Sequence, residues 1–124
     1  RAGQGVAYAS GGKGGNQAVA AARFGASVGF GGQTGRDDFG ERLRQNLESA
    51  GVDISCVGYD AISGSGMSVA ITEQGGEYGA VVVSGANLTI NAAAIAEAWQ
   101  QLWGCKILLL QNEIPELVSL AAAK

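Results

Sequence analysis

The sequence has 124 residues, of which 47% are hydrophobic and 15% charged, with 21 glycines and one proline; this fits one globular domain at most and not a disordered chain. A net charge of −3 argues against nucleic acid or an anionic membrane surface as a partner. Because the chain has no histidine, it excludes histidine-ligated zinc, Ser-His-Asp triads and imidazole bases built from these residues.

The first half of the chain predicts strands and helices in alternation: a strand end at 6–10, a loop at 11–15, a helix at 16–24, a short strand at 27–31 and a polar turn at 33–37. Residues 38–50 give the clearest amphipathic helix. Its Phe39, Leu43 and Leu47 fall four apart on one face, and Gly51 stands at the stop position. Asp37 and Asp38 are expected to cap this helix rather than to act as a catalytic pair.

The second half predicts a strand at 52–59, a hairpin with strands at 67–72 and 78–84, a helix at 91–103, a buried parallel strand at 106–111 and a helix from Pro115 onward. In the first hairpin strand, apolar residues alternate with small ones, which suits a flap lying over something. We expect Ile95, Trp99 and Leu102 to face the core. Strands alternating with helices indicate an α/β fold with a parallel sheet, to which the antiparallel hairpin is an addition.

The stretch "GGKGGNQAVAAARFG" at 11–25 is the first candidate binding site. It is not a phosphate-binding P-loop, and Gln17 stands where a dinucleotide fingerprint needs its third glycine. Backbone N–H groups at a helix N-terminus favour acceptor atoms. Asn16 can donate to and accept from a vicinal diol, and Lys13 adds three donors, so the stretch suits a polyhydroxylated ligand. The alternative is a tight turn with Asn16 as the helix cap.

Glu113 is the second candidate, because it follows the strand predicted from "KILLLQ". Ligands of open α/β sheets lie beyond the carboxyl ends of parallel strands, where a carboxylate could accept a hydrogen bond from a sugar hydroxyl. The alternative is a solvated loop acid. Cys56 and Cys105 belong to no metal-spaced pair and are expected to be reduced, buried thiols.

Neither a membrane-spanning apolar run nor a signal peptide is visible in the sequence, so we expect a cytoplasmic protein. The chain starts at Arg1 rather than Met, and residues 115–124 stop within a helical pattern. Both ends therefore look cut, and we expect a piece of a longer protein.

The order of motifs resembles that of the ribokinase-type carbohydrate kinases of the PfkB family: "GGKGGNQAVAAARFGA", "GRDDFGERL", "NLESAGVD", "SGANLTI" and "LLLQNEIPE". The resemblance implies a three-layer α/β/α core, here partial, with a small antiparallel β-sheet lid formed by strands at 6–10, 57–59 and 67–84. In ribokinases the lid also pairs two subunits, so a homodimer is implied. The resemblance also assigns a sugar-binding role to Gly12, Lys13, Gly14, Gly15, Asn16 and Glu113.

The same resemblance implies that residues 1–124 lack the nucleotide-binding half and its catalytic aspartate, and that a sugar-binding aspartate would precede Arg1. The intact enzyme would use ATP and Mg²⁺, with a monovalent cation as a further candidate, whereas this chain alone would bind none of them and would not be a kinase. Positioning and charge stabilisation, on which phosphoryl transfer depends, would both be missing.

Several residues depart from the family pattern and affect the expected substrate. Gly15 replaces the usual alanine and Tyr78 a frequent asparagine, and Ser68, Ala70 and Ala80 make the lid smaller or more polar than in many ribokinases. Ribose is the first expectation. Another sugar, a sugar acid or a nucleoside is the alternative within the family, and a non-catalytic sugar- or nucleotide-binding module is the alternative outside it.

Overall fold

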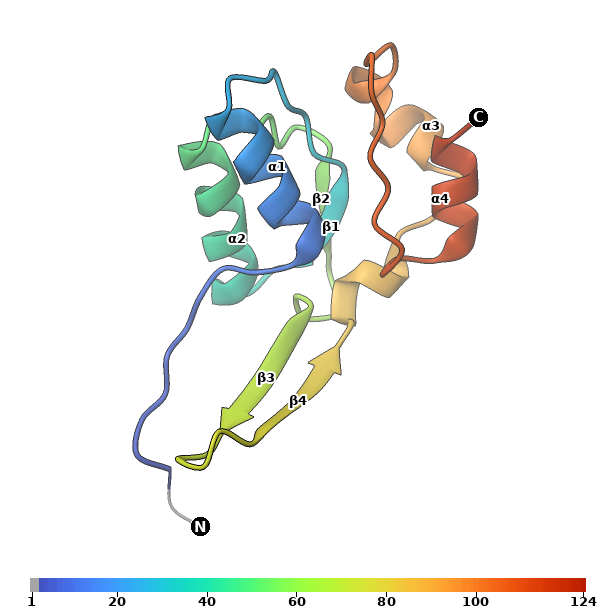
Figure 1. Ribbon diagram of the computed structural model, residues 1–124. Helices are drawn as coiled ribbons and strands as arrows, with labels where there is room; N and C mark the ends of the chain where they lie inside the picture. The colour runs from blue at the N-terminus through green and yellow to red at the C-terminus, as the bar shows by residue number, and fades with distance from the viewer. Residues whose placement is uncertain (1–2) are drawn as a thin grey trace.

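The structure is a computed structural model that describes residues 3–124, and Arg1, where the expected domain begins, lies outside the described part. Helices, short 3₁₀ turns (η) and strands follow one another along the chain (Figure 1), in the order α1 (Lys13–Arg23), β1 (Gly32–Gly35), α2 (Asp38–Ser49), β2 (Val57–Asp60), β3 (Met67–Thr72), β4 (Tyr78–Val83), η1 (Gly85–Thr89), α3 (Ile95–Ala98), η2 (Gln100–Leu102) and α4 (Glu116–Ala122).

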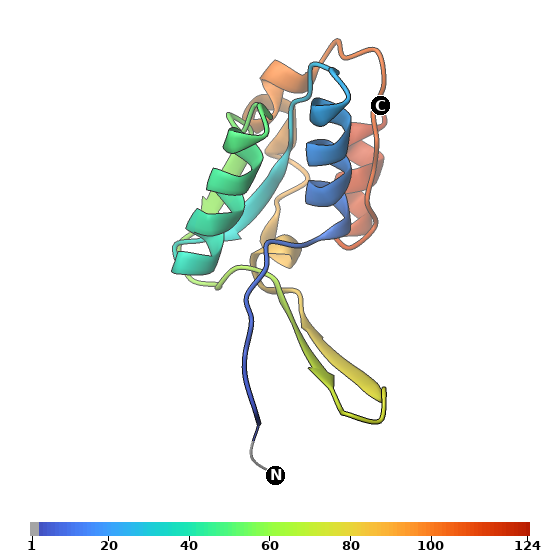
Figure 2. The same ribbon diagram turned by 60° about the vertical axis from the view of Figure 1, so that its left-hand side comes forward.

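The centre of the body is a parallel pair of strands, β1 and β2, in a register that runs from Gly32 opposite Val57 to Gly35 opposite Asp60. A bridge between Gly29 and Asp53 extends the pairing toward the start of both strands. Helices α1 and α2 lie on one side of this sheet, and α3 and α4 lie on the other (Figures 1 and 2). The predicted three-layer α/β/α core with a parallel sheet is therefore confirmed.

In the segment that leads into β1, successive residues face opposite sides of the sheet, and a separate hydrophobic cluster lies on each side. Val28 and Phe30 pack toward α1 and α2, against a cluster of Ala18, Leu47 and Val52. Gly29 and Gly31 face the other layer, where a Cβ on Gly29 would stand 2.5 Å from Leu102 Cδ2. The glycines let α3 and η2 approach the sheet backbone closely.

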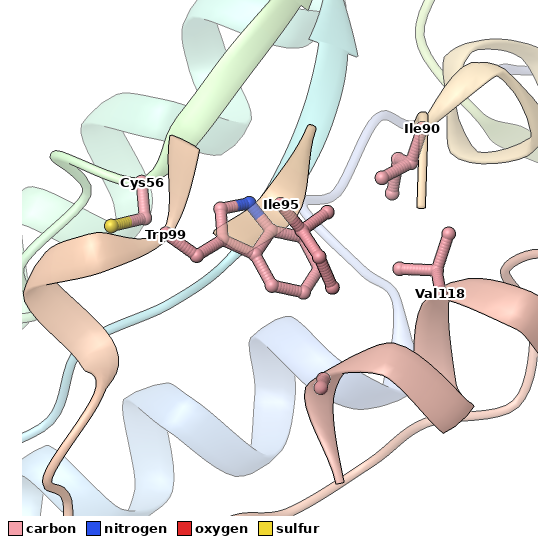
Figure 3. Packing of buried hydrophobic residues seen from close by; sticks show 6 residues of the cluster. Cys56, Ile90, Ile95, Trp99 and Val118 are labelled. Atoms are coloured by element: carbon pink, nitrogen blue, oxygen red, sulfur yellow. The ribbon is translucent and has the colours of Figure 1, made fainter. Parts of the chain in front are cut away.

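The second cluster joins α3 and α4 to Cys56, just before β2, and Ile90, just after η1. Figure 3 shows Ile95 and Trp99 at its centre, with Ile90 and Val118 facing each other beside them. Ile95 and Trp99 are 2% and 8% exposed, as their spacing predicts. The single helix predicted for 91–103 is wrong, because Trp99 leaves the helical backbone at φ −111° and the chain continues as η2.

The predicted strand boundaries around β1 and β2 are partly wrong. Within 27–31 only Gly29 makes a bridge, and the ladder lies at Gly32–Gly35, where a polar turn was expected. The segment 57–59, expected in the lid, instead pairs in parallel with β1 in the body. Pairing with a neighbour, not side-chain pattern, decides which of these short polar segments become strands.

Two further predicted strands are extended segments without ladder pairing in the described part of the chain: 6–10 and 106–111. Val6 and Tyr8 are 79% and 66% exposed, and the Tyr8 ring meets Phe39 at a centroid distance of 6.0 Å. Ile107 and Leu109 are 78% and 70% exposed, so the expected burial of 106–111 is wrong for this chain. Neither segment has a strand beside it to complete its hydrogen bonds.

The predicted hairpin is confirmed: β3 and β4 pair antiparallel from Met67 opposite Val83 to Thr72 opposite Tyr78. It projects away from the body (Figure 1), and every residue of both strands is exposed. In residues 3–124 no helix is long and apolar enough to cross a membrane.

Candidate functional site

The glycine-rich stretch forms the start of α1. The helix begins at Lys13 rather than at Asn16, with Gly12 as its N-terminal cap residue at φ 90°, a backbone conformation that favours glycine. The N–H of Asn16 donates to the Gly12 carbonyl at 2.9 Å, so Asn16 lies one turn inside the helix and is not its cap. Its side chain is exposed and is left for contacts outside the helix.

Gly14 is the point at which α1 approaches the rest of the body most closely in this stretch. A Cβ there would stand 3.4 Å from the Phe30 ring and 3.7 Å from Cβ of Gln111, whereas a Cβ on Gly15 would meet nothing within 4 Å. The start of α1 therefore lies against the end of the 106–111 segment. This contact brings the two candidate regions of the sequence together.

Lys13 and Glu113 meet although they are 100 residues apart in the sequence: Lys13 Nζ donates a hydrogen bond to Glu113 Oε1 and forms an ion pair with it. The hydrogen bond and charge of Lys13 hold the pKa of Glu113 below its usual value, with a smaller effect from Gln111. The two side chains are 68% and 56% exposed, so both remain accessible to a ligand. The roles assigned to them in sugar binding stay predictions.

The Lys13–Glu113 pair lies at the end of the body from which the hairpin emerges. Both ribbon views show the start of α1, the turn before α4 and the base of the hairpin at this end (Figures 1 and 2). Strands β1 and β2 also end here, at Gly35 and Asp60. This is the edge at which open α/β sheets bind ligands.

Two aspartates at the same end of the sheet make contacts that the sequence does not reveal. Asp37 caps α2, as predicted, by accepting a hydrogen bond from the Gly40 N–H at 2.8 Å, and it also accepts from Ser65. The Thr89 hydroxyl and the amides of Ser63 and Ile62 lower the pKa of Asp60 to about 2. Aspartates beside glycine and serine are frequent in turns of any protein, so the sequence does not indicate that Asp37 contacts Ser65 or that Asp60 contacts Thr89. Only the fold shows these contacts.

Cysteines and metal-binding groups complete the survey of reactive side chains. Both cysteines are free thiols, but only Cys56 is buried, so the prediction of burial is wrong for Cys105. Across residues 3–124, no three side chains of histidine, cysteine, aspartate or glutamate come together as a metal site would require.

Comparison with known proteins assigns the chain to a family. A family model described as pfkB family carbohydrate kinase matches residues 2–123. The ribokinase of Bacillus subtilis is 40% identical over 106 residues, covering 86% of this chain and 36% of the relative. The deoxyribokinase of Salmonella typhi is 32% identical over 104 residues, covering 84% and 34%.

A solved structure of Arabidopsis thaliana ribokinase complexed with ribose and ATP superposes with a TM-score of 0.80 at 28% identity, covering 91% of this chain and 37% of that one. The chain thus spans little more than a third of the length of these relatives. The match over nearly all of this chain establishes the family: the chain belongs to the pfkB carbohydrate kinases.

Proposed function

We propose that the protein containing this chain is an ATP-dependent sugar kinase and that ribose is its substrate. The observation that carries the proposal is the meeting of Lys13 and Glu113 at the start of α1, with both side chains exposed at the ligand-binding edge of the sheet. The similarity to a ribokinase solved with ribose and ATP supports the choice of sugar and nucleotide.

Each residue of the proposed sugar site would supply one kind of contact. The free N–H groups at the start of α1 would donate to sugar oxygens, Lys13 would add further donors, and Asn16 would both donate and accept. Glu113, kept ionised by Lys13, would accept from a sugar hydroxyl. Gly14 and Gly15 would let the sugar lie close to the backbone.

The nucleotide would be held by residues beyond this chain, as the family resemblance implies. ATP supplies the γ-phosphoryl group, and Mg²⁺ neutralises charge on the phosphates as the group moves. The contribution of this chain is to fix the acceptor hydroxyl in place, because positioning is a large part of phosphoryl-transfer catalysis. Residues 1–124 by themselves would therefore release no ADP from ATP and ribose.

Calorimetric titration of the intact protein with ribose tests the site. Loss of a hydrogen bond to a charged group should weaken binding about tenfold or more in Glu113→Gln and Lys13→Met. Glu97→Gln, an exposed change on α3, is the matched control and should bind as the unaltered protein does. Equal affinity in all of these proteins would refute the site, and ADP formation by residues 1–124 alone would refute the assignment of catalysis to the rest of the protein.

A different sugar is the second candidate, and the lid favours testing it. Ser68 pairs with Val82, and Ala70 pairs with Ala80, so three small side chains lie together with Val82 on one face of the hairpin. The similarity to a deoxyribokinase points the same way. Turnover of ribose and deoxyribose should differ strongly if Asn16 and Glu113 read a diol. Sugar binding without ADP formation by the intact protein would instead favour a binding module.

The exposed hairpin also supports a proposed homodimer. Val81 and Val82 are 66% and 70% exposed on opposite faces of β4, and large apolar side chains left open in this way favour association. We propose that a second copy packs against β3 and β4. In sedimentation experiments, Val81→Lys, on the face away from Ser68 and Ala70, should shift the intact protein toward monomer, and an unchanged dimer would count against this surface.

A further inference from the structure

The hairpin joins the body through a compact root, which we define as residues 62–66 and 84–87. The N–H of Ala86 donates to the Gly64 carbonyl at 2.8 Å, which ties the exit leg to the entry leg. A Cβ on Gly66 would stand 2.2 Å from Asn87 Nδ2, and one on Gly85 would stand 2.4 Å from the Gly64 oxygen. The two legs are therefore packed so closely that they form one unit.

One connection between this root and the body is the contact of Asp37 with Ser65. Asp37 Oδ2 accepts from the Ser65 N–H at 2.8 Å, and Asp37 Oδ1 accepts from the Ser65 hydroxyl at 2.6 Å. Asp37 Oδ1 also accepts from Gly40, and the Ser65 oxygen accepts from the Gly35 N–H at 3.0 Å. Ser65 is 5% exposed. The pair thus joins the end of β1, the start of α2 and the hairpin root.

The strands themselves give the hairpin little hold on the body, since every residue of β3 and β4 is exposed. Asp60 also binds the entry leg, accepting from Ile62 and Ser63, but these partners are only two and three residues away. The contact between Asp37 and Ser65 spans 28 residues and reaches another element. On the exit leg, Thr89 donates to the Ala86 carbonyl at 2.9 Å and accepts from Gln33 of β1 at 2.7 Å. The contact between Asp37 and Ser65 is therefore the long-range contact that holds the entry leg.

We infer that Asp37 and Ser65 are positioning residues: they fix the pose of the hairpin beside Lys13 and Glu113 and so control sugar affinity without touching the sugar. The inference rests on the proposed sugar site. Hydrogen bonds to a carboxylate are stronger than neutral ones, and burial of Ser65 keeps water from replacing them. Without the pair, the hairpin would sample several directions and would be in the binding pose for a smaller fraction of the time.

The first test measures the hairpin pose in the intact protein without ligand. Spin labels are attached at Gln74→Cys, on the hairpin tip, and at Glu48→Cys, on α2, in a protein that carries Cys105→Ser and no other reactive thiol. Pulsed electron paramagnetic resonance then measures the distribution of distances between the two labels. The distribution should have one narrow peak in the unaltered protein and should lose it in Ser65→Ala.

Asp37→Asn should lose the narrow peak as well. Asp53→Asn is the matched control, because Asp53 accepts from the Ser55 N–H at 2.8 Å in a local turn far from the hairpin, and it should keep the peak. Ser65→Ala removes the two bonds of the Ser65 hydroxyl, to Asp37 and from Gly35, and keeps the N–H bonds of Ser65 and Gly40 to Asp37. It therefore tests the hydroxyl alone and still reports on the hairpin if Asp37→Asn fails to fold. A narrow peak in both variants would overturn the inference.

The second test titrates the same variants with ribose and measures KM and kcat. The affinity for ribose should fall about tenfold in Ser65→Ala, as expected when the hairpin is in its binding pose for only about a tenth of the time. Hydrogen exchange across α1 should stay unchanged. Uniform loss of protection across the protein with no change in KM would show a merely structural role and overturn the inference. So would a broadened distribution with unchanged affinity. If the unaltered protein binds no sugar, the proposed function fails, while the distance data still judge the role of the pair in holding the hairpin.

Discussion

Gly40 and Gly15 offer a direct test of how tightly the hairpin root is packed against α2. Each is the third residue of its helix, α2 or α1, so an alanine at either position should gain at most about 1 kcal/mol from helix propensity. At Gly40 a Cβ would stand 2.4 Å from the Gly35 carbonyl oxygen and 2.7 Å from Ser65 Oγ. A Cβ on Gly15 would meet nothing within 4 Å.

The expected result is opposite in sign for the two variants. Overpacking costs about 1–3 kcal/mol, and the shift it forces also weakens the bond from Gly40 to Asp37, a helix cap worth about 1 kcal/mol. Gly40→Ala should therefore lower the free energy of unfolding by about 1–3 kcal/mol, after subtraction of the propensity gain. Gly15→Ala should raise it slightly. Urea denaturation of the intact protein measures both, and a Gly40→Ala protein as stable as its parent would refute the packing argument.

The remaining predictions concern acid stability, the core and the turns. Asp60 has a folded pKa of about 2, below its ordinary 3.8, so its contribution to the free energy of unfolding is full above pH 3.8 and is lost as pH falls toward 2. In acid titrations followed by circular dichroism, Asp60→Asn should therefore lose less stability over this pH range than the unaltered protein. Trp99→Ala, at a site 8% exposed, should cost about 3–5 kcal/mol in calorimetry, and Trp103→Ala, at 39%, clearly less. Gly85→Ala should lower the melting temperature more than Gly76→Ala, because both have positive φ but only Gly85 would also strike a carbonyl oxygen.

The elements that the sequence predicts well carry their own local signals. Helix α2 has an apolar stripe, an aspartate that accepts from Gly40, and Gly51 at φ 84° after its end. The hairpin has an alternating pattern and a glycine at the turn, where Gly76 adopts φ 84°. These features act over a few residues, so they can be read without knowledge of the rest of the fold.

The elements that the sequence misplaces depend on partners far along the chain. Strand β1 consists of Gly-Gln-Thr-Gly and has no apolar alternation, yet it forms a strand because β2 lies beside it. The contact of Lys13 with Glu113 follows from the order of strands and not from periodicity, and family resemblance alone brought the two residues into one site. No pattern near Ser65 indicates its partner Asp37.

The segment 106–111 has the apolar pattern of a buried strand but is neither paired nor buried in this structure. Ile107, Leu108, Leu109 and Leu110 are 41–78% exposed, although the chain packs into the core on either side, through Leu102 and Ile114. Burial of each such side chain typically contributes about 1.5–3 kcal/mol, so a neighbour that covered the run would stabilise it. This chain spans 36% of the Bacillus subtilis relative. We therefore expect a strand from the rest of the protein to cover the segment.

Hydrogen exchange separates this explanation from a simple misprediction. In residues 1–124 alone, the amides of 107–110 should exchange rapidly, because they have no ladder to protect them. In the intact protein the same amides should be strongly protected, while those of β3 and β4 serve as an internal reference, since their pairing lies within this chain. Rapid exchange of 107–110 in both proteins would show that the apolar run is not a strand, and that Glu113 does not follow the end of one.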